Sequence, residues 1–309
     1  MRLLVCTVAL CFGAGLVGIT GAMQPVAGAA VVPTAARQQL GRLLFFEPAL
    51  SINGKRSCAS CHRPEKAFTD HRGTSRALRF AGNLSRNSPT LLNAADQTSF
   101  FHDGRAGSLA AVIESVLTNP DEFNSTYTLT TERLRGSAEY RRLFRQAFRA
   151  PIAAATINAA LGAYLRSLTA VHSPYDQALA GGPALPVAAV AGAALFAGDG
   201  RCAACHAGPQ FRDGQRHEVA PGQWRKTPTL RNVAVTMPYL ADGSRATLHA
   251  VLTDNFHRTQ PRRPLAPAEL DDLTAFLETL TDTTSADHTV PPSLPLLPAL
   301  PERVVGGLY

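Results

Sequence analysis

Two copies of one five-residue pattern, C-x-x-C-H, constrain this chain more than any other feature of its sequence. They are Cys58-Ala59-Ser60-Cys61-His62 and Cys202-Ala203-Ala204-Cys205-His206. In this pattern both thiols bond covalently to a c-type haem, and the histidine ligates the haem iron on one face. One match could be half of a zinc site, but two matches about half a chain apart predict two covalent haems. The predicted attachment residues are Cys58, Cys61, Cys202 and Cys205, and the predicted axial ligands are His62 and His206.

The other two cysteines, Cys6 and Cys11, lie in a segment that has the pattern of a secretory signal peptide. A basic second residue precedes an apolar, charge-free run over residues 3–19, and Ala27-Gly28-Ala29 matches a small-residue cleavage signal. The alternative, a membrane-spanning helix, needs about 20 apolar residues, slightly more than this run provides. We therefore expect residues 1–29 to be removed, leaving a periplasmic protein without a membrane span.

The charge balance argues against nucleic-acid binding. The chain carries 30 Lys and Arg against 23 Asp and Glu, a formal net charge of +7, but the basic residues are scattered and form no tract. A moderate, dispersed positive charge suits solubility or an acidic redox partner better than it suits a nucleic-acid backbone.

The haem motifs belong to a longer internal repeat. Arg86-Asn87-Ser88-Pro89-Thr90-Leu91-Leu92-Asn93 recurs as Arg225-Lys226-Thr227-Pro228-Thr229-Leu230-Arg231-Asn232. An Asp-Gly turn follows at residues 103–104 and again at 242–243, each with an apolar helical stretch after it. Because order and spacing agree in both halves, we expect two cytochrome-c-like helical domains with one haem each, over residues 30–182 and 183–309.

Hydrophobic periodicity predicts a mainly α chain, and no long alternating strand pattern is present. Gly181–Pro186 is the expected linker between the halves, and the Pro-rich residues 291–301 are expected to form an extended tail on the surface. Apolar residues at helical spacing occur over residues 35–46, 109–117, 139–148, 152–168, 187–196 and 269–280.

These motifs, together with R-N-S-P-T-L, F-x-D-G-R-A and T-P-T-L-R-N-V-A-x-T-x-P-Y, resemble the bacterial di-haem cytochrome c peroxidase family, which includes the MauG enzyme. The resemblance extends from about Gln38 to Leu280. It implies that peroxide reacts at the haem of His62 and that the haem of His206 holds or passes electrons. It also implies that Glu122 is catalytic, since a carboxylate there would shuttle a proton between the peroxide oxygens. Read alone, Glu122 would be a solvated acid after a helix.

The resemblance further implies a calcium ion between the haems. The family holds this ion through an asparagine side chain and backbone carbonyls near a T-x-P segment, and Asn87, Thr236 and Pro238 match that pattern. Ligands that are all oxygen atoms suit Ca²⁺. The implied oxidant is hydrogen peroxide. The implied partner is either a small electron-donor protein, such as a c-type cytochrome or a cupredoxin, or a protein whose side chains are oxidised.

The chain departs from the family at its first haem. Peroxidases that need reductive activation have a distal histidine eight residues before the asparagine of R-N-S-P-T, and here Arg79 stands at that position. His71 is near but out of register, as expected for a surface or turn residue. The first haem is therefore expected to be five-coordinate and open to peroxide, which argues against a pure electron carrier. Val112 replaces a glutamine that often accompanies the catalytic glutamate, so the distal pocket should be more apolar.

A second departure is at the position before D-G-R, where the family usually has a tryptophan between the haems. His102 occupies this position, and Trp224 is the only tryptophan of the chain. Histidine is far harder to oxidise than indole, so electron transfer through this side chain would be impaired. We treat His102 as a candidate catalytic residue, with a hydrogen-bonding role near the haem propionates and an ordinary turn residue as the alternatives.

The sixth ligand of the second haem is the third departure. Alignment places Asn255 where the family has methionine or tyrosine, and asparagine is a poor iron ligand. His257, two residues further on, is the preferred candidate, ahead of an open or water-bound site and of Met237. His217 and His249 are further candidates whose positions are more typical of surface residues.

The leading functional prediction is a periplasmic di-haem peroxidase that reduces H₂O₂ to water with electrons from a small redox protein. One alternative is a MauG-like oxidase that modifies side chains of a partner protein. The other is a non-enzymatic di-haem electron carrier, which would have two six-coordinate haems and would not react with peroxide.

Overall fold

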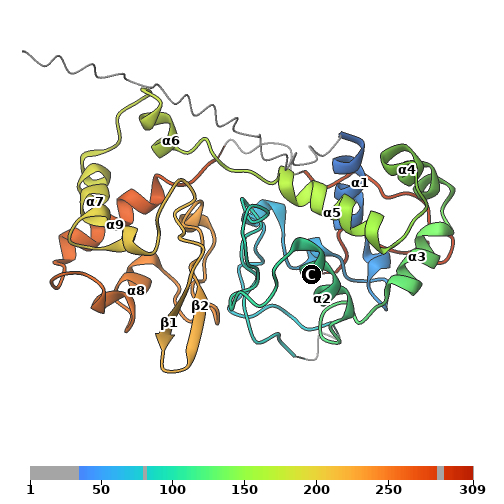
Figure 1. Cartoon of the computed structure of the whole chain (residues 1–309), viewed down its shortest axis with the longest axis horizontal. Coiled ribbons are helices and arrows are strands. Elements are labelled where there is room, and N and C mark those ends of the chain that lie inside the picture. Colours follow the sequence, from blue (N-terminus) through green and yellow to red (C-terminus); the bar gives the residue numbers. More distant parts are fainter. Residues whose placement is uncertain (1–34, 79–81, 284–288, 309) are drawn as a thin grey trace, which may run out of the picture. The chain divides into compact units, whose positions relative to one another are not determined.

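Helices form most of the regular structure, so the prediction of a mainly α fold is confirmed (Figure 1). The computed structural model describes residues 35–78, 82–283 and 289–308; the expected signal peptide and Arg79 lie outside the described residues. The helices are α1 (Ala35–Phe45), α2 (Leu109–Thr118), α3 (Tyr127–Arg135), α4 (Ala138–Phe148), α5 (Ala154–Ser167), α6 (Pro174–Leu179), α7 (Val187–Ala197), α8 (Leu248–Leu252) and α9 (Pro267–Glu278). Within the described part of the chain, no helix is long and apolar enough to cross a membrane.

Two helices and one two-stranded hairpin have no counterpart among the predicted stretches. Helix α3 is rich in threonine and charged residues, so its apolar periodicity is weak; Thr126 begins it by accepting a hydrogen bond from Leu129 N through its side chain (3.2 Å). Helix α6 is only six residues long and begins after Ser173, whose side chain accepts a hydrogen bond from Asp176 N. Strands β1 (Arg216–Ala220) and β2 (Gln223–Lys226) form an antiparallel hairpin that is largely polar on both faces and therefore lacks a buried alternation.

The sequence repeat is accompanied by a repeat of the structure, because each half contains a pair of closely packed helices. Helix α1 packs on α5 and α7 packs on α9. At each crossing a glycine lies against the facing backbone. A Cβ on Gly41 would overlap Ala160 O and come within 2.8 Å of Tyr164 Cβ; on Gly192 it would overlap Asp272 O and come within 2.9 Å of Phe276 Cβ. Only glycine permits this approach.

The same crossings carry matching aromatic pairs, four residues after each glycine. Phe45 and Tyr164 have ring centroids 5.2 Å apart with planes inclined at 60°, and Phe196 and Phe276 are also 5.2 Å apart, inclined at 59°. Tilted pairs at this separation are favourable beyond their buried area. The two halves therefore share a helix-packing unit whose first helix precedes the C-x-x-C-H motif and whose second helix follows it in the chain.

The asparagine of each P-T-L-x-N segment fastens that segment to the end of the second helix of its pair. Asn93 N donates to Leu168 O (2.7 Å) and Asn232 N donates to Leu280 O (3.0 Å). Both asparagines have positive φ, of 55° and 60°, a conformation that asparagine tolerates better than most residues. The repeated asparagine is thus explained by backbone geometry.

Buried apolar side chains form two clusters, one around α1, α4 and α5 and one around α7 and α9. The domain boundary expected between residues 182 and 183 stays a prediction, but packing assigns two segments differently. Tyr175 of α6 packs against the second cluster. Leu297 of the tail is fully buried in the first cluster, so residues 289–308 return to the first half instead of covering only the surface.

The close helix crossings yield a first prediction. Gly41→Ala and Gly192→Ala should each lower the free energy of unfolding by about 1–3 kcal/mol, since an added methyl group forces apart two packed backbones. Gly107→Ala is the control, because a Cβ there meets nothing within 4 Å. Chemical denaturation of the haem-loaded protein measures all three, and equal stability of all three variants would contradict the packing.

Candidate functional site

Both motif histidines are oriented in the same way. His62 Nδ1–H donates to Phe68 O (3.0 Å), and His206 Nδ1–H donates to Phe211 O (3.1 Å). A hydrogen bond at Nδ1 fixes the tautomer and leaves Nε2 as the lone-pair donor to a metal. Burial lowers the pKa of His62, and it lowers that of His206 to about 4. Both rings are therefore neutral at physiological pH, as iron ligation requires.

The carbonyls that receive these bonds are placed by the threonine of each P-T-L-x-N segment. Thr90 Oγ1 donates to Ala67 O (2.6 Å), the residue before Phe68, and Thr229 Oγ1 donates to Gln210 O (2.7 Å), the residue before Phe211. The repeated segments thus hold the loop that orients each histidine. Sequence comparison found the repeat but did not identify this purpose, because backbone carbonyls leave no residue-type signal.

The motif cysteines are half-buried, and their thiols are in the neutral form. Burial raises the pKa of Cys58 to about 12 and those of Cys61 and Cys202 to about 11; it also raises the pKa of Cys205. None of the four forms a disulfide. Zinc binding would require thiolates, whereas a thioether to haem is uncharged. The environment therefore fits covalent haem attachment better than a zinc site.

A cavity of about 600 Å³ adjoins the second motif. It opens beside Cys202, Cys205 and His206, so both thiols and the ligating histidine reach it. A large, mostly apolar macrocycle with polar edge groups suits such a lining. The apolar part of the lining comes from Phe196, Leu230, Val233, Leu248, Val251, Leu252, Leu273 and Leu277, and cations on its edge include Arg86, Arg225, Lys226 and Arg245.

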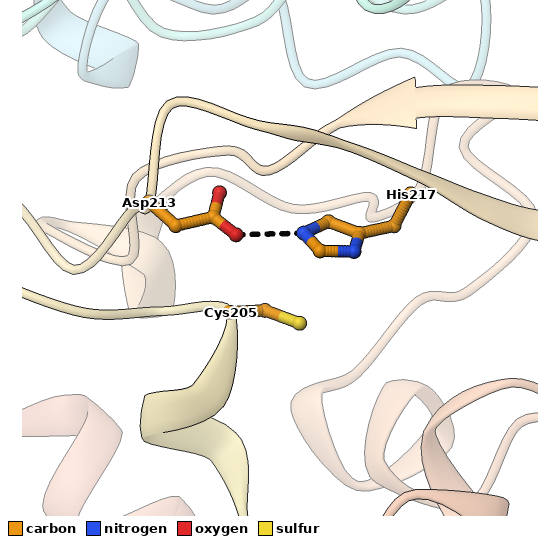
Figure 2. A group of neighbouring side chains, drawn as sticks. All are labelled: Cys205, Asp213 and His217. Atoms are coloured by element: carbon orange, nitrogen blue, oxygen red, sulfur yellow. Dashed lines mark hydrogen bonds and ion pairs between the residues drawn. The ribbon is translucent and has the colours of Figure 1, made fainter.

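Cys205, Asp213 and His217 gather at the edge of this cavity, with ligand atoms within 4.8 Å of one another (Figure 2). Figure 2 shows His217 Nε2 hydrogen-bonded to Asp213 Oδ2 (2.6 Å) with the Cys205 sulfur below the pair. Once Cys205 is a thioether, its sulfur is a poor metal ligand, so the trio does not constitute a zinc site. Because Asp213 engages Nε2, His217 is a weak candidate for the sixth iron ligand.

His257 fits the sixth-ligand position best among the residues considered. It lines the same cavity as His206, and its proximity contributes to lowering the pKa of His206, after the larger effect of burial. Its Nδ1–H donates to Asp254 Oδ1 (3.1 Å), which leaves Nε2 for a metal, as at the two motif histidines. Asn255 also lines the cavity. The ligand assignment stays a prediction.

The other candidates lie elsewhere. Met237 has 37 % of its surface exposed and His249 is also exposed; neither is among the residues that line the cavity. His71 is exposed, with Nε2 hydrogen-bonded to Val235 O (3.0 Å), in keeping with a turn residue.

Glu122 lies near the first motif. Its Oε1 accepts a hydrogen bond from Asn119 Nδ2 (2.7 Å), and its charge contributes to the raised pKa values of Cys58 and Cys61. Burial raises the pKa of Glu122 itself, partly offset by the Asn119 bond and by the charges of Arg105 and Arg56. This environment differs from that of the solvated acid considered as the alternative, although a catalytic role stays a prediction.

His102 joins the two repeats. Its Nε2–H donates to Asn87 O (3.1 Å), and its own carbonyl accepts from Lys226 N of β2 (2.9 Å). It also lines the cavity beside the second motif. Burial, then the neighbouring cations, lowers its pKa and favours the neutral ring. These contacts support the hydrogen-bonding alternative for His102.

Asn87 contacts the T-x-P segment that the calcium prediction names, and the calcium site itself stays a prediction. Its Nδ2–H₂ donates to Pro238 O (3.0 Å) and Leu240 O (2.8 Å), while its buried Oδ1 accepts no hydrogen bond from the residues that the structure describes. Thr236 Oγ1 donates to Val233 O (3.1 Å), and the predicted role of Thr236 through its backbone carbonyl stays a prediction. A buried amide oxygen that lacks a hydrogen-bond donor among the described residues is compatible with an oxygen-liganded cation.

The helical fold and the two matched attachment sites define the protein as a di-haem c-type cytochrome. The sequence model described as di-haem cytochrome c peroxidase matches residues 35–184, and that of cytochrome c matches residues 189–281. The chain is 38 % identical to the methylamine utilization protein MauG of Methylorubrum extorquens, over 78 % of this chain and 77 % of that protein. It is 31 % identical to the cytochrome c551 peroxidase of Pseudomonas aeruginosa, over 79 % and 78 %.

A solved structure of a MauG-like protein associated with microbial copper homeostasis superposes with a TM-score of 0.74, at 29 % identity, over 84 % of this chain and 92 % of that one. The di-haem peroxidase BthA of Burkholderia thailandensis shares the fold, with a TM-score of 0.70, 23 % identity, and 81 % and 87 % covered. The chain belongs to the di-haem cytochrome c peroxidase family that includes MauG.

The ligand assignment at the second haem can be tested directly. His257→Ala should turn the second haem from low spin to high spin, because the variant removes the nitrogen that would complete its coordination. His249→Ala is the matched control, since that histidine is exposed. EPR of the oxidised proteins provides the measurement, and an unaltered low-spin signal in His257→Ala would exclude this ligand.

Proposed function

We propose that this chain is an exported di-haem peroxidase that reduces hydrogen peroxide to water with electrons from a small redox protein. The observation that carries the proposal is the placement of Glu122, a partly buried carboxyl with a raised pKa beside the first attachment motif. An electron carrier has no use for a titratable group there, whereas peroxide cleavage requires a proton to move between two oxygens. Membership of a family that contains named peroxidases supports the same reaction.

Glu122 supplies the proton transfer in this proposal. Its carboxylate removes a proton from one peroxide oxygen and returns it to the other, so that the second oxygen leaves as water. The complete reaction consumes two protons and two electrons and yields two water molecules. The haems, when bound, supply the redox chemistry. Asn119 Nδ2 holds Oε1 of Glu122, so the other carboxyl oxygen is the one available to the substrate.

The second half accepts the electrons in this proposal, and His102 keeps the two halves in register. Its ring is tied to Asn87 of the first repeat and its main chain to Lys226 of the second. We assign His102 a positioning role instead of a redox role, since imidazole is a poor carrier of an oxidising equivalent. The donor proposed is a c-type cytochrome or a cupredoxin, whose acidic face would suit the positive charge of this chain.

A MauG-like oxidation of a partner protein is the second candidate. It is favoured by the 38 % identity to MauG of Methylorubrum extorquens and by the likeness to a solved MauG-like structure. Both candidates consume peroxide at the first haem and differ only in the source of electrons: a redox protein in one case, side chains of a bound protein in the other.

We also propose that Ca²⁺ binds between Asn87 and the carbonyls near Pro238. The orphaned Oδ1 of Asn87 supports this site. Added Ca²⁺ should raise the thermal midpoint of chelator-treated protein, because a ligand that binds only the folded state stabilises it. Asn87→Ala should abolish the rise; an equal rise in both proteins would place any bound calcium elsewhere.

Glu122→Gln should reduce peroxide turnover by about 10²–10⁴-fold, the usual contribution of one positioned acid–base group. Asp121→Asn is the control, since that neighbouring carboxyl is exposed. Turnover is measured as peroxide-dependent oxidation of a reduced small cytochrome. Equal rates for Glu122→Gln and the unaltered protein would remove this residue from the mechanism.

The pH profile gives an independent check of the same residue. The base form of Glu122 is lost as the pH falls through its pKa, and burial raises that pKa. Turnover should therefore begin to fall at a higher pH than an ordinary glutamate would give, and this acid limb should be absent from the residual activity of Glu122→Gln. An unchanged limb would assign the titration to another group.

Two measurements separate the candidate functions. A peroxidase oxidises the reduced redox protein with two electrons per peroxide, whereas a MauG-like oxidase leaves it reduced and adds oxidised side chains to a partner, detected by mass spectrometry. An electron carrier shows two low-spin haems whose spectra are unaffected by peroxide. That spectrum would overturn the enzyme proposal in both forms.

A further inference from the structure

The tail of residues 289–308 ends on the attachment loop of the first haem. Gly306 O accepts hydrogen bonds from the side chains of Ser57 (2.6 Å) and Ser60 (3.0 Å). These serines immediately precede Cys58 and Cys61, and both are buried. Two donors from one attachment loop therefore converge on a single carbonyl that is about 250 residues away in sequence.

Backbone contacts extend the same junction. Leu308 N donates to Lys55 O and Gly306 N donates to Phe46 O, both at 2.8 Å, and Gly307 pairs with Arg56 in an antiparallel bridge. Gly307 has φ of 78°, and a Cβ there would lie 2.7 Å from Lys55 O and 2.8 Å from Ser60 Oγ. The Gly306–Gly307 turn thus fits against the loop only because residue 307 carries no side chain.

The turn is held in place from behind by a buried ion pair. Arg303 Nε donates to Glu47 Oε1 (2.6 Å), and Tyr140 Oη donates to Glu47 Oε2 (2.6 Å). All three groups are buried, and Leu297 fixes the tail in the first core. A buried carboxylate tolerates loss of its partner poorly, so the tail is bound firmly to this half.

The second haem lacks this support, and the sequence shows why. In the second motif Arg201 and Ala204 stand at the positions of Ser57 and Ser60, so both hydroxyl donors are missing. Ala204 is exposed, whereas Ser60 is buried. The two attachment loops are otherwise alike in their 3₁₀ turns, over Cys58–Ser60 and Cys202–Ala204, and in their histidine–carbonyl bonds.

We propose that the Gly306–Gly307 turn is a positioning element for the first haem alone. It fixes the loop that carries Cys58, Cys61 and His62, and so sets the spin state and reduction potential of the haem held there. Arg56 pairs with the turn through its main chain. The positive charge of its side chain lowers the pKa values of Cys61 and Glu122, against the larger effect of burial, which raises them. The proposal rests on haem attachment at the first motif and not on peroxide chemistry.

Ser57→Ala/Ser60→Ala and Gly307→Ala test the proposal in the full, haem-loaded protein. Potentiometric titration followed by EPR should show a shifted midpoint or altered g-values for the first haem and none for the second, which serves as an internal control. Ser60→Ala alone gives the first motif the residue of the second at that position, and it should produce part of the same shift even if Gly307→Ala does not fold. Leu296→Ala, an exposed tail residue, should alter neither haem.

Two results would overturn the proposal. Unaltered first-haem signals in the double serine variant would show that the tail does not act on this haem. Equal changes at both haems would reveal a general effect on folding. Selective loss of covalent haem from the first motif, seen as halved haem content by pyridine haemochrome assay, would instead support it. These experiments measure the haems and not peroxide turnover. They therefore test the role of the tail even if the protein does not react with peroxide.

Discussion

The bond from Nδ1 of each motif histidine to a backbone carbonyl is the interaction on which the rest of this structure depends. A haem iron needs a neutral imidazole held at one angle, and a loop carbonyl can hold it only if the loop itself is fixed. The structure fixes each loop through a threonine, fastens the following asparagine to a helix end, and brings that helix against a second one at a glycine. Each of these contacts occurs in both halves, so each half has the same set of contacts that hold its motif histidine in place.

The two halves differ in the residues that surround each haem-attachment motif. Glu122 has no equivalent in the repeated segments, and the serines of the first motif are replaced in the second. The second half instead has the Asp254–His257 pair facing the cavity of His206. The supports of the two haem sites are therefore alike and their surroundings differ, and it is the surroundings that tune a bound cofactor.

Sequence reading predicted most of the helices, since apolar periodicity is a local signal. The attachment residues, taken from the equally local C-x-x-C-H pattern, stay a prediction. Sequence reading also brought Asn87 and Pro238 together, through the family resemblance. It missed α3, whose buried face includes Thr130 and Thr131, and the hairpin, which has no apolar alternation. It could not predict the hydrogen bond from Asn119 to Glu122 or the bond from His62 to the carbonyl of Phe68. Contacts made by turns and main-chain atoms depend on the folded path of the chain and leave no pattern of residue types. The return of the tail to the first core was missed for the same reason.

That return has a consequence for the order of assembly. The second half is built from segments that follow one another closely in the chain, whereas the first half is completed by residues that come after the whole second half. Long loops are costly to close and slow to form. The second repeat can therefore reach its final packing while the first is still open at its attachment loop, which reverses the usual progression from the N-terminal domain onward. The contacts of Gly306 with Ser57 and Ser60, which flank Cys58 in the attachment loop, can therefore form only after nearly the whole chain has been made.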